Sequence, residues 1–194
     1  SHEYDKNYMG IKITPEAIVE NALNYNCESI AWTYNEPTIH LPFSKKTSLL
    51  ARQKNLKVIY VTNGYFSAKS VEEILGYVDA FNIDLKSMRD DFYKNVCGAE
   101  LDIVLDNILR VYEEGKHLEI TNLIINGYND TVEEITDLCD FVVSQLGPEV
   151  PLHFSRAFPY YKMNDISPTR SEILFKAREI ALDRGIENVH LGNI

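Results

Sequence analysis

Short apolar runs separated by helix-forming segments repeat along most of the chain, and they predict alternating strands and helices. Six runs are rich in the β-branched and aromatic residues typical of buried strands: 29–33, 57–61, 79–86, 117–125, 150–156 and 188–191. The segments between them place apolar residues at helical spacing. Because the connections have the length of right-handed crossovers, we predict an α/β protein with a parallel sheet.

Capping patterns predict where the helices begin. The segment 14–16 combines a threonine cap with a proline at the first helical position, and 70–73 is a capping-box pattern. Asp130 and Glu133 are expected to open a later helix, and the last helix is expected to begin within 167–172. The first ten residues lack periodicity, and we expect a loop there.

The predicted strand at 79–86 alternates strictly between apolar and polar residues. Asn82, Asp84 and Lys86 fall on one side of it, and apolar residues fall on the other. A strand covered by helices on both faces should be apolar throughout. The polar side is therefore expected to face a wet or ligand-filled space.

Polar residues also gather where the predicted strands end. Tyr34, Asn35 and Glu36 follow the first strand, and Pro37 prevents further strand pairing. In alternating β/α proteins, ligands bind at the carboxyl ends of the strands. The candidate site collects such residues from successive strands: Asn35, Glu36, Asn63, Asp84, Lys86, Asn122 and His153.

Structural roles are open for the same residues. The cluster around Asn35 can be a strand-to-helix turn, Asp84 and Lys86 can form a structural ion pair, and His153 can be a core histidine with satisfied nitrogens. No glycine-rich phosphate-binding fingerprint is found, which disfavours a dinucleotide-binding fold or a nucleotide hydrolase. A complete or partial (β/α) barrel fits the pattern best.

Composition narrows the function classes. The 194 residues are 45% hydrophobic and 25% charged, enough for one core, and we expect a single domain over 1–194. The net charge of −10 argues against a nucleic-acid partner. No apolar run reaches membrane-span length and no signal-peptide pattern opens the chain, so we expect no membrane partner.

The three cysteines suggest neither disulfides nor a metal site. Cys27, Cys97 and Cys139 lie 70 and 42 positions apart. This usage fits a reducing cytoplasm. Cys139 falls on the apolar face of its predicted helix and is expected to be buried. Asn129 begins a glycosylation sequon, which helix capping explains better.

Several motifs together resemble those of radical S-adenosylmethionine (SAM) enzymes. They are Thr33-Tyr34-Asn35-Glu36-Pro37, Val61-Thr62-Asn63-Gly64, Asn82-Ile83-Asp84-Leu85-Lys86, 92–98, 117–130 and 153–159. The chain is most similar to the radical SAM protein of the AmmeMemoRadiSam system, a branch that itself resembles pyruvate formate-lyase-activating enzymes. The likeness runs from Thr14 to Asn193. It implies a partial (β/α) barrel, the radical SAM core.

The resemblance implies roles for the candidate residues. Tyr34, Asn35 and Glu36 stand where the family has a Gly-Gly-Glu segment, which holds the methionyl amino group of SAM. By the same resemblance Asp84 and Lys86 lie near the methionyl group and the substrate. Asn63 and His153 would then contact the nucleoside, and Asn122 is also expected to bind the cofactor. A carboxylate for the ammonium and a cation for the carboxylate suit this ligand chemically.

The chain departs from the family in one respect. The Cys-x3-Cys-x2-Cys loop that ligates a [4Fe–4S] cluster is absent. The family places that loop after a first strand, which would lie upstream of Ser1. We therefore expect this chain to be a fragment, an incomplete core without its first strand and cluster loop, and inactive by itself.

The resemblance implies that the full-length enzyme uses SAM and a [4Fe–4S] cluster. It would reductively cleave SAM to a 5′-deoxyadenosyl radical for hydrogen abstraction, with an electron donor as partner and a protein or small molecule as substrate. Two alternatives stay open: a lyase that forms a Schiff base on Lys86, and a non-catalytic binding or scaffold domain.

Overall fold

Six parallel strands form one sheet in the part of the chain that the structure describes. The computed structural model describes residues 11–194, so the loop expected at 1–10 lies outside the described residues. Each strand pairs with the next one in sequence. The strands are β1 (Ser29–Trp32), β2 (Lys57–Thr62), β3 (Ala80–Asp84), β4 (His117–Ile124), β5 (Leu152–Arg156) and β6 (Val189–Gly192). The predicted α/β class and partial barrel are confirmed.

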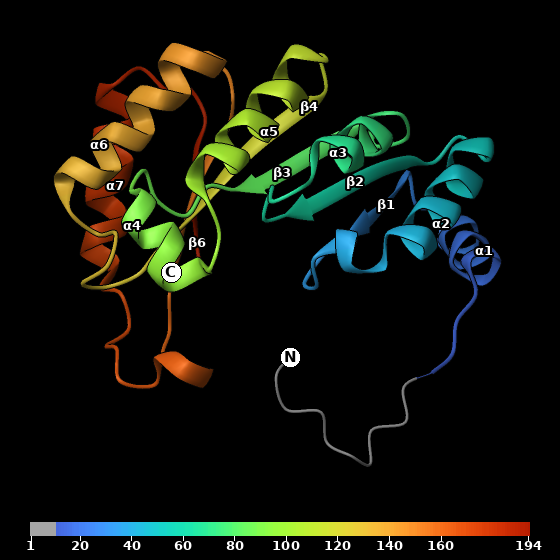
Figure 1. Ribbon diagram of the computed structural model, residues 1–194, viewed down its shortest axis with the longest axis horizontal. Coiled ribbons are helices and arrows are strands. Elements are labelled where there is room, and N and C mark those ends of the chain that lie inside the picture. Colours follow the sequence, from blue (N-terminus) through green and yellow to red (C-terminus); the bar gives the residue numbers. More distant parts are fainter. Residues whose placement is uncertain (1–10) are drawn as a thin grey trace.

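Helices follow the outer side of this curved sheet (Figure 1). The α-helices are α1 (Pro15–Asn24), α2 (Leu41–Gln53), α3 (Ala68–Leu75), α4 (Asp90–Phe92), α5 (Leu101–Glu113), α6 (Val132–Phe141) and α7 (Ser171–Asp183). Two short 3-10 helices, η1 (Pro37–His40) and η4 (Tyr161–Met163), and two π-helical segments, η2 (Tyr93–Cys97) and η3 (Val142–Leu146), complete the described elements. None of the described helices is long and apolar enough to cross a membrane.

The capping residues partly differ from those expected. Thr14 caps α1 as predicted, because its hydroxyl oxygen accepts the backbone N–H of Ala17 at 3.2 Å. The cap of α3 is Ser67, so the predicted start at Ser70 was wrong. Thr131 caps α6 in place of Asp130. Ser67 and Thr131 have the extended backbone that a cap requires.

Thr169 lies within the range predicted for the start of α7, but it does not cap the helix. Its side chain is buried, and its hydroxyl donates a hydrogen bond of 2.6 Å to the backbone carbonyl of Ile124. The helix begins at Ser171. Thr169 thus ties the loop after β5 to the end of β4.

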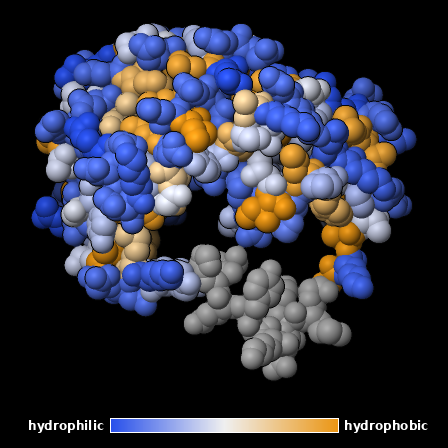
Figure 2. Space-filling view, viewed as in Figure 1, coloured by the Kyte–Doolittle hydropathy of each residue, from blue (hydrophilic) through white to orange (hydrophobic). Residues whose placement is uncertain are grey.

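The two faces of the sheet differ in composition. On the face toward the helices, the strands bury large apolar side chains, among them Tyr60, Phe81, Ile83, Ile120 and Phe154. On the opposite, inner face the side chains are only half-buried, as the alternating burial along β2, β3 and β4 shows. The polar side predicted for β3 lies on this inner face. Figure 2 shows a hollow on this inner side, between the β1 end of the molecule and the loop after β5.

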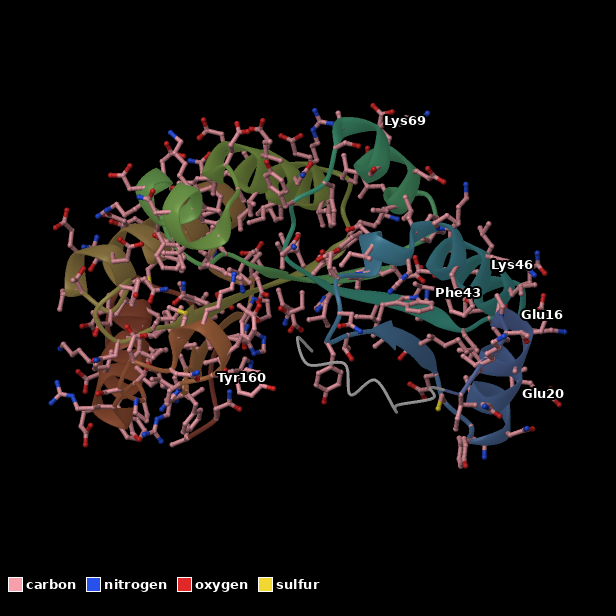
Figure 3. The ribbon with its side chains drawn as sticks, turned by 60° about the horizontal axis from the view of Figure 1, so that its bottom comes forward. Glu16, Glu20, Phe43, Lys46, Lys69 and Tyr160 are labelled. Carbon is pink, nitrogen blue, oxygen red and sulfur yellow. The ribbon has the colours of Figure 1, made fainter. Side chains whose placement is uncertain are left out.

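Helices α1 and α2 pack against each other near β1, at one edge of the sheet. Lys46 of α2 forms an ion pair of 2.7 Å with Glu16 of α1, and both side chains remain more than half exposed (Figure 3). Phe43 of α2 meets Trp32 of β1 edge to face, with ring centroids 6.0 Å apart. Among the described residues β1 pairs on one side only, with β2. This is the open edge expected of an incomplete barrel.

Candidate functional site

The chain turns sharply after β1. Tyr34 has a positive φ of 68°, and the backbone N–H of Asn35 donates to the carbonyl of Thr33 at 2.9 Å. A hydrogen bond between residues two apart defines a γ-turn, which is strained when the central φ is positive. Tyr34 and Asn35 are therefore held in an exposed turn at the carboxyl edge of the sheet.

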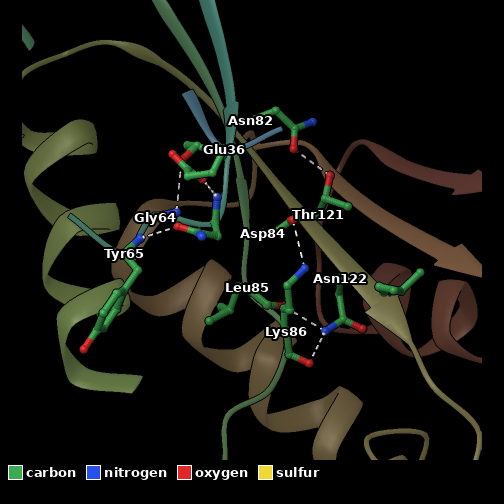
Figure 4. A network of polar contacts seen from close by, with 12 residues as sticks. Glu36, Gly64, Tyr65, Asn82, Asp84, Leu85, Lys86, Thr121 and Asn122 are labelled. Carbon is green, nitrogen blue, oxygen red and sulfur yellow. Dashed lines mark hydrogen bonds and ion pairs between the residues drawn. The ribbon is translucent and has the colours of Figure 1, made fainter. Parts of the chain in front are cut away.

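The Glu36 carboxylate joins this turn to the end of β2 (Figure 4). Its Oε1 accepts the Thr38 N–H at 3.2 Å and the Thr38 hydroxyl at 2.9 Å. The Thr62 hydroxyl lies 2.9 Å from both carboxylate oxygens, and Oε2 also accepts the Asn63 N–H at 2.9 Å. Four protein donors therefore surround a group that has about four lone-pair positions. Glu36 fixes the relative position of the two strand ends.

Asn63, Asp84 and Lys86 line one pocket of about 380 Å³ beside these strand ends. Lys86 Nζ lies 2.9 Å from Asp84 Oδ2, and each side chain is 29% exposed. Asn63 is placed by its own turn, since its Oδ1 accepts the Tyr65 N–H at 2.9 Å. Gly64 in that turn has φ +71°, and a Cβ there would lie 2.8 Å from Ile83. The three predicted residues are brought together.

The far wall of this pocket is mainly apolar. It is formed by the segment that runs from α4 through η2, and by the end of β4. Gly98 ends η2 in a left-handed conformation, and the Ala99 N–H donates to the Tyr93 carbonyl at 3.0 Å. Burial raises the pKa of the Cys97 thiol, although the charge of Lys86 opposes this effect. The remaining apolar lining consists of Phe92, Val96, Val104, Leu123, Ile125 and Met163.

Asn122 faces away from the hollow. It is buried on the helix side of β4, and its Nδ2 donates to the carbonyls of Leu85 at 2.8 Å and Lys86 at 3.1 Å. Asn129, which is also buried, donates to the Lys86 and Leu123 carbonyls and accepts the N–H of Ile125. Both amides hold the chain after β3 in place. Asn122 therefore supports the backbone of Lys86 from the helix side of the sheet.

His153 lies on the inner face of the sheet, as predicted for a residue that faces a ligand. Asp84 is in register with Thr121, and Thr121 with His153. Asp84 and His153 therefore lie on one row two strand spacings apart, about 10 Å. The His153 side chain is 29% exposed, and its Nε2 is 2.8 Å from Glu119 Oε2.

Several residues that shape the site were not predicted as site residues. Thr62 and Asn129 are polar, short and buried, and their contacts are long-range in sequence. Asn107 of α5 holds the turn after β2 by donating to the Gly64 carbonyl at 2.9 Å. Glu119 interrupts an apolar strand, and this sequence signal could have identified it as a site residue.

The Radical SAM superfamily model matches residues 2–142, which is more than half of the chain. The chain belongs to the radical SAM superfamily. This family uses SAM together with a [4Fe–4S] cluster. The family match favours a radical SAM enzyme over the two alternatives, a Schiff-base lyase and a non-catalytic binding or scaffold domain.

Two relatives match most of this chain. An uncharacterized protein from Methanocaldococcus jannaschii is 42% identical over 183 residues, which cover 94% of this chain and 54% of the relative. The (2S)-3-sulfopropanediol dehydratase activating enzyme of Klebsiella oxytoca is 20% identical over 156 residues, covering 80% of this chain and 49% of that enzyme. The chain thus spans about half the length of these relatives.

Solved structures confirm the fold. A domain of a pyruvate-formate lyase-activating enzyme from Bacteroides vulgatus superposes with a TM-score of 0.71 at 22% identity, covering 85% of this chain and 99% of that domain. Streptococcus suis SuiB bound to S-adenosylmethionine gives a TM-score of 0.74 at 14% identity, over 95% of this chain and 45% of SuiB.

The donors at the site fit the two cofactors unequally. In residues 11–194, no group of three or more His, Cys, Asp or Glu side chains could hold a metal ion. Cys27, Cys97 and Cys139 are free thiols. SAM is matched better, since the ammonium of Lys86 suits its carboxylate and the charge of Glu36 suits its amino group. The side chains in the described part of the chain thus suit SAM chemically, and no set of cluster ligands is found among them.

Proposed function

We propose that this chain is the SAM-binding part of a radical SAM enzyme of the activating-enzyme type. The observation that supports the proposal most strongly is the shared pocket of Asn63, Asp84 and Lys86, in a chain of this family. When bound, SAM and the cluster would supply the 5′-deoxyadenosyl radical that abstracts a hydrogen atom. An electron donor for the cluster is then a required partner.

Lys86 would bind the carboxylate of SAM. Asp84 keeps the Lys86 ammonium at 2.9 Å on the pocket wall. The Lys86 N–H donates to Tyr93 Oη at 3.1 Å, which fixes its backbone. A preorganised cation loses little side-chain entropy when it receives an anion.

Glu36 would attract the amino group of SAM by its negative charge. Its lone pairs already accept four protein donors, so the incoming ammonium would take the place of one of them. The hydroxyl of Thr38 or of Thr62 is the donor that can leave, because a hydroxyl rotates whereas a backbone N–H does not. Asn63 and His153 would line the nucleoside.

The apolar half of the pocket would receive the substrate. Its walls carry few charges beyond Asp84 and Lys86, and a volume of about 380 Å³ suits a single side chain or a small molecule. Either a protein segment or a metabolite therefore fits. Ala99→Trp should fill this space, so hydrogen abstraction from the substrate should fall while SAM binding is retained.

The test is made on the complete protein that the gene encodes, after reconstitution with iron and sulfide. On reduction it should form 5′-deoxyadenosine from SAM, measured by liquid chromatography and mass spectrometry. Lys86→Ala should weaken SAM binding by about 10- to 100-fold, the effect of one charged hydrogen bond. Lys176→Ala, on the surface of α7, is the matched control and should change nothing. Failure of the reconstituted wild type to form 5′-deoxyadenosine would refute the proposal.

A further inference from the structure

A cluster of histidines surrounds Glu119 on the inner face of the sheet. Glu119 Oε1 lies 3.0 Å from His117 Nε2, and Oε2 lies 2.8 Å from His153 Nε2. Asn82 Nδ2 donates to the same Oε2 at 3.4 Å. Burial raises the pKa of Glu119, but the hydrogen bonds and charges of His117 and His153 more than offset this and lower it overall.

These contacts determine which ring nitrogen of His153 carries a proton. An ionised carboxylate accepts hydrogen bonds and donates none. The Nε2 atom that contacts Glu119 must therefore be protonated. In the neutral ring, Nδ1 is then left unprotonated and can accept a hydrogen bond.

The orientation of the His153 ring is fixed as well. One face stacks on His190 of β6, with ring centroids 4.7 Å apart and an interplanar angle of 25°. One edge is bound to Glu119, and the side chain is 29% exposed. Stacking on a face and a hydrogen bond at an edge leave the ring little freedom to rotate.

We propose that Glu119 is a positioning residue that holds His153 in the Nε2–H form and so presents Nδ1 as a hydrogen-bond acceptor to a nucleoside in the hollow. A nucleoside suits this acceptor, because it offers hydroxyl and amino donors. The inference rests on the proposed function, which places SAM in this hollow. No metal ion explains the cluster, since the described residues form no metal-binding group.

The first experiment needs no ligand. In the complete protein labelled with ¹⁵N-histidine, long-range ¹H–¹⁵N spectra at pH 8.5 report the protonation of each ring nitrogen. His153, assigned with a His153→Gln variant, should show a protonated Nε2 and an unprotonated Nδ1. A proton on Nδ1, or rapid averaging of the two forms, would overturn the proposal.

The second experiment asks whether Glu119 acts through His153. SAM affinity of the reconstituted protein is measured by calorimetry for Glu119→Ala, His153→Ala and the double variant. Each single variant should bind about tenfold more weakly, the effect of one hydrogen bond, and the double variant should be no weaker than His153→Ala. Glu119→Gln serves as a second variant if Glu119→Ala does not fold. Glu179→Ala, a surface glutamate of α7, should bind like the wild type.

The outcomes separate the two proposals. Additive losses in the double variant, or an unchanged affinity in Glu119→Ala, would overturn the positioning role. If the wild type itself does not bind SAM, the proposed function is wrong, and the ligand-free spectra still decide the protonation of His153.

Discussion

The hydrogen bonds of Glu36 lead to a prediction about folding that is independent of any ligand. Glu36→Gln keeps the shape of the side chain but replaces one acceptor oxygen by an NH₂ donor. If the remaining oxygen stays with Thr38, the new NH₂ group faces the Asn63 N–H, which now donates to the Oε2 of Glu36 at 2.9 Å. One charge-assisted bond is lost and the others lose their charge.

The magnitude follows from the contacts. A hydrogen bond to a charged group contributes about 1.5–3 kcal/mol, so Glu36→Gln should lower the free energy of unfolding by about 2–3 kcal/mol. For a chain of this length that corresponds to a fall in Tm of roughly 4–10 °C. Thr62→Val removes one donor and should cost about 1 kcal/mol, whereas Thr62→Ser retains the hydroxyl.

Urea unfolding followed by circular dichroism measures these differences, without SAM in the buffer. When Glu36→Gln is already present, adding Thr62→Val should lower the free energy of unfolding by less than it does in the wild type, because the Thr62 hydroxyl donates to Glu36. If the free energy of unfolding of Glu36→Gln lies within about 0.5 kcal/mol of that of the wild type, a margin typical of surface substitutions, the hydrogen bonds of Glu36 do not hold the strand ends together.

Three further predictions concern other parts of the fold. Burial alone would raise the pKa of Asp79, but the Val58 N–H and the Arg52 guanidinium outweigh it and lower the pKa. The ionised Asp79 therefore stabilises the fold above the ordinary pKa of 3.8, and this contribution is lost as the pH falls through the lowered pKa. In urea unfolding, Asp79→Asn should be less stable than the wild type at pH 7 and nearly as stable below the lowered pKa. Burial raises the pKa of Cys139 to about 12, so a thiol reagent at pH 8 should label Cys139 only after unfolding; labelling in the folded protein would contradict its burial. Asn129→Ala leaves the N–H of Ile125 without its acceptor and should cost about 3 kcal/mol, and a loss below about 1 kcal/mol in urea unfolding would argue against the support given to β3 and β4.

The candidate site was predictable where it depends on the alternation of one strand. Asp84 and Lys86 share a side of β3 in the sequence pattern, and the structure places them on one pocket wall. Asn63 joins them because it follows the neighbouring parallel strand. The position of Asn122 was harder to predict, since a strand end does not reveal which face the last polar residue occupies.

The sequence by itself determined the order of strands and helices, the polar side of β3 and the family. These features are local, because hydrophobic periodicity and short motifs are properties of neighbouring residues. Tertiary structure decided which donors surround Glu36, and which acceptor fixes the ring of His153. Those contacts join residues up to 34 positions apart, so they follow from the register of the strands rather than from any segment alone.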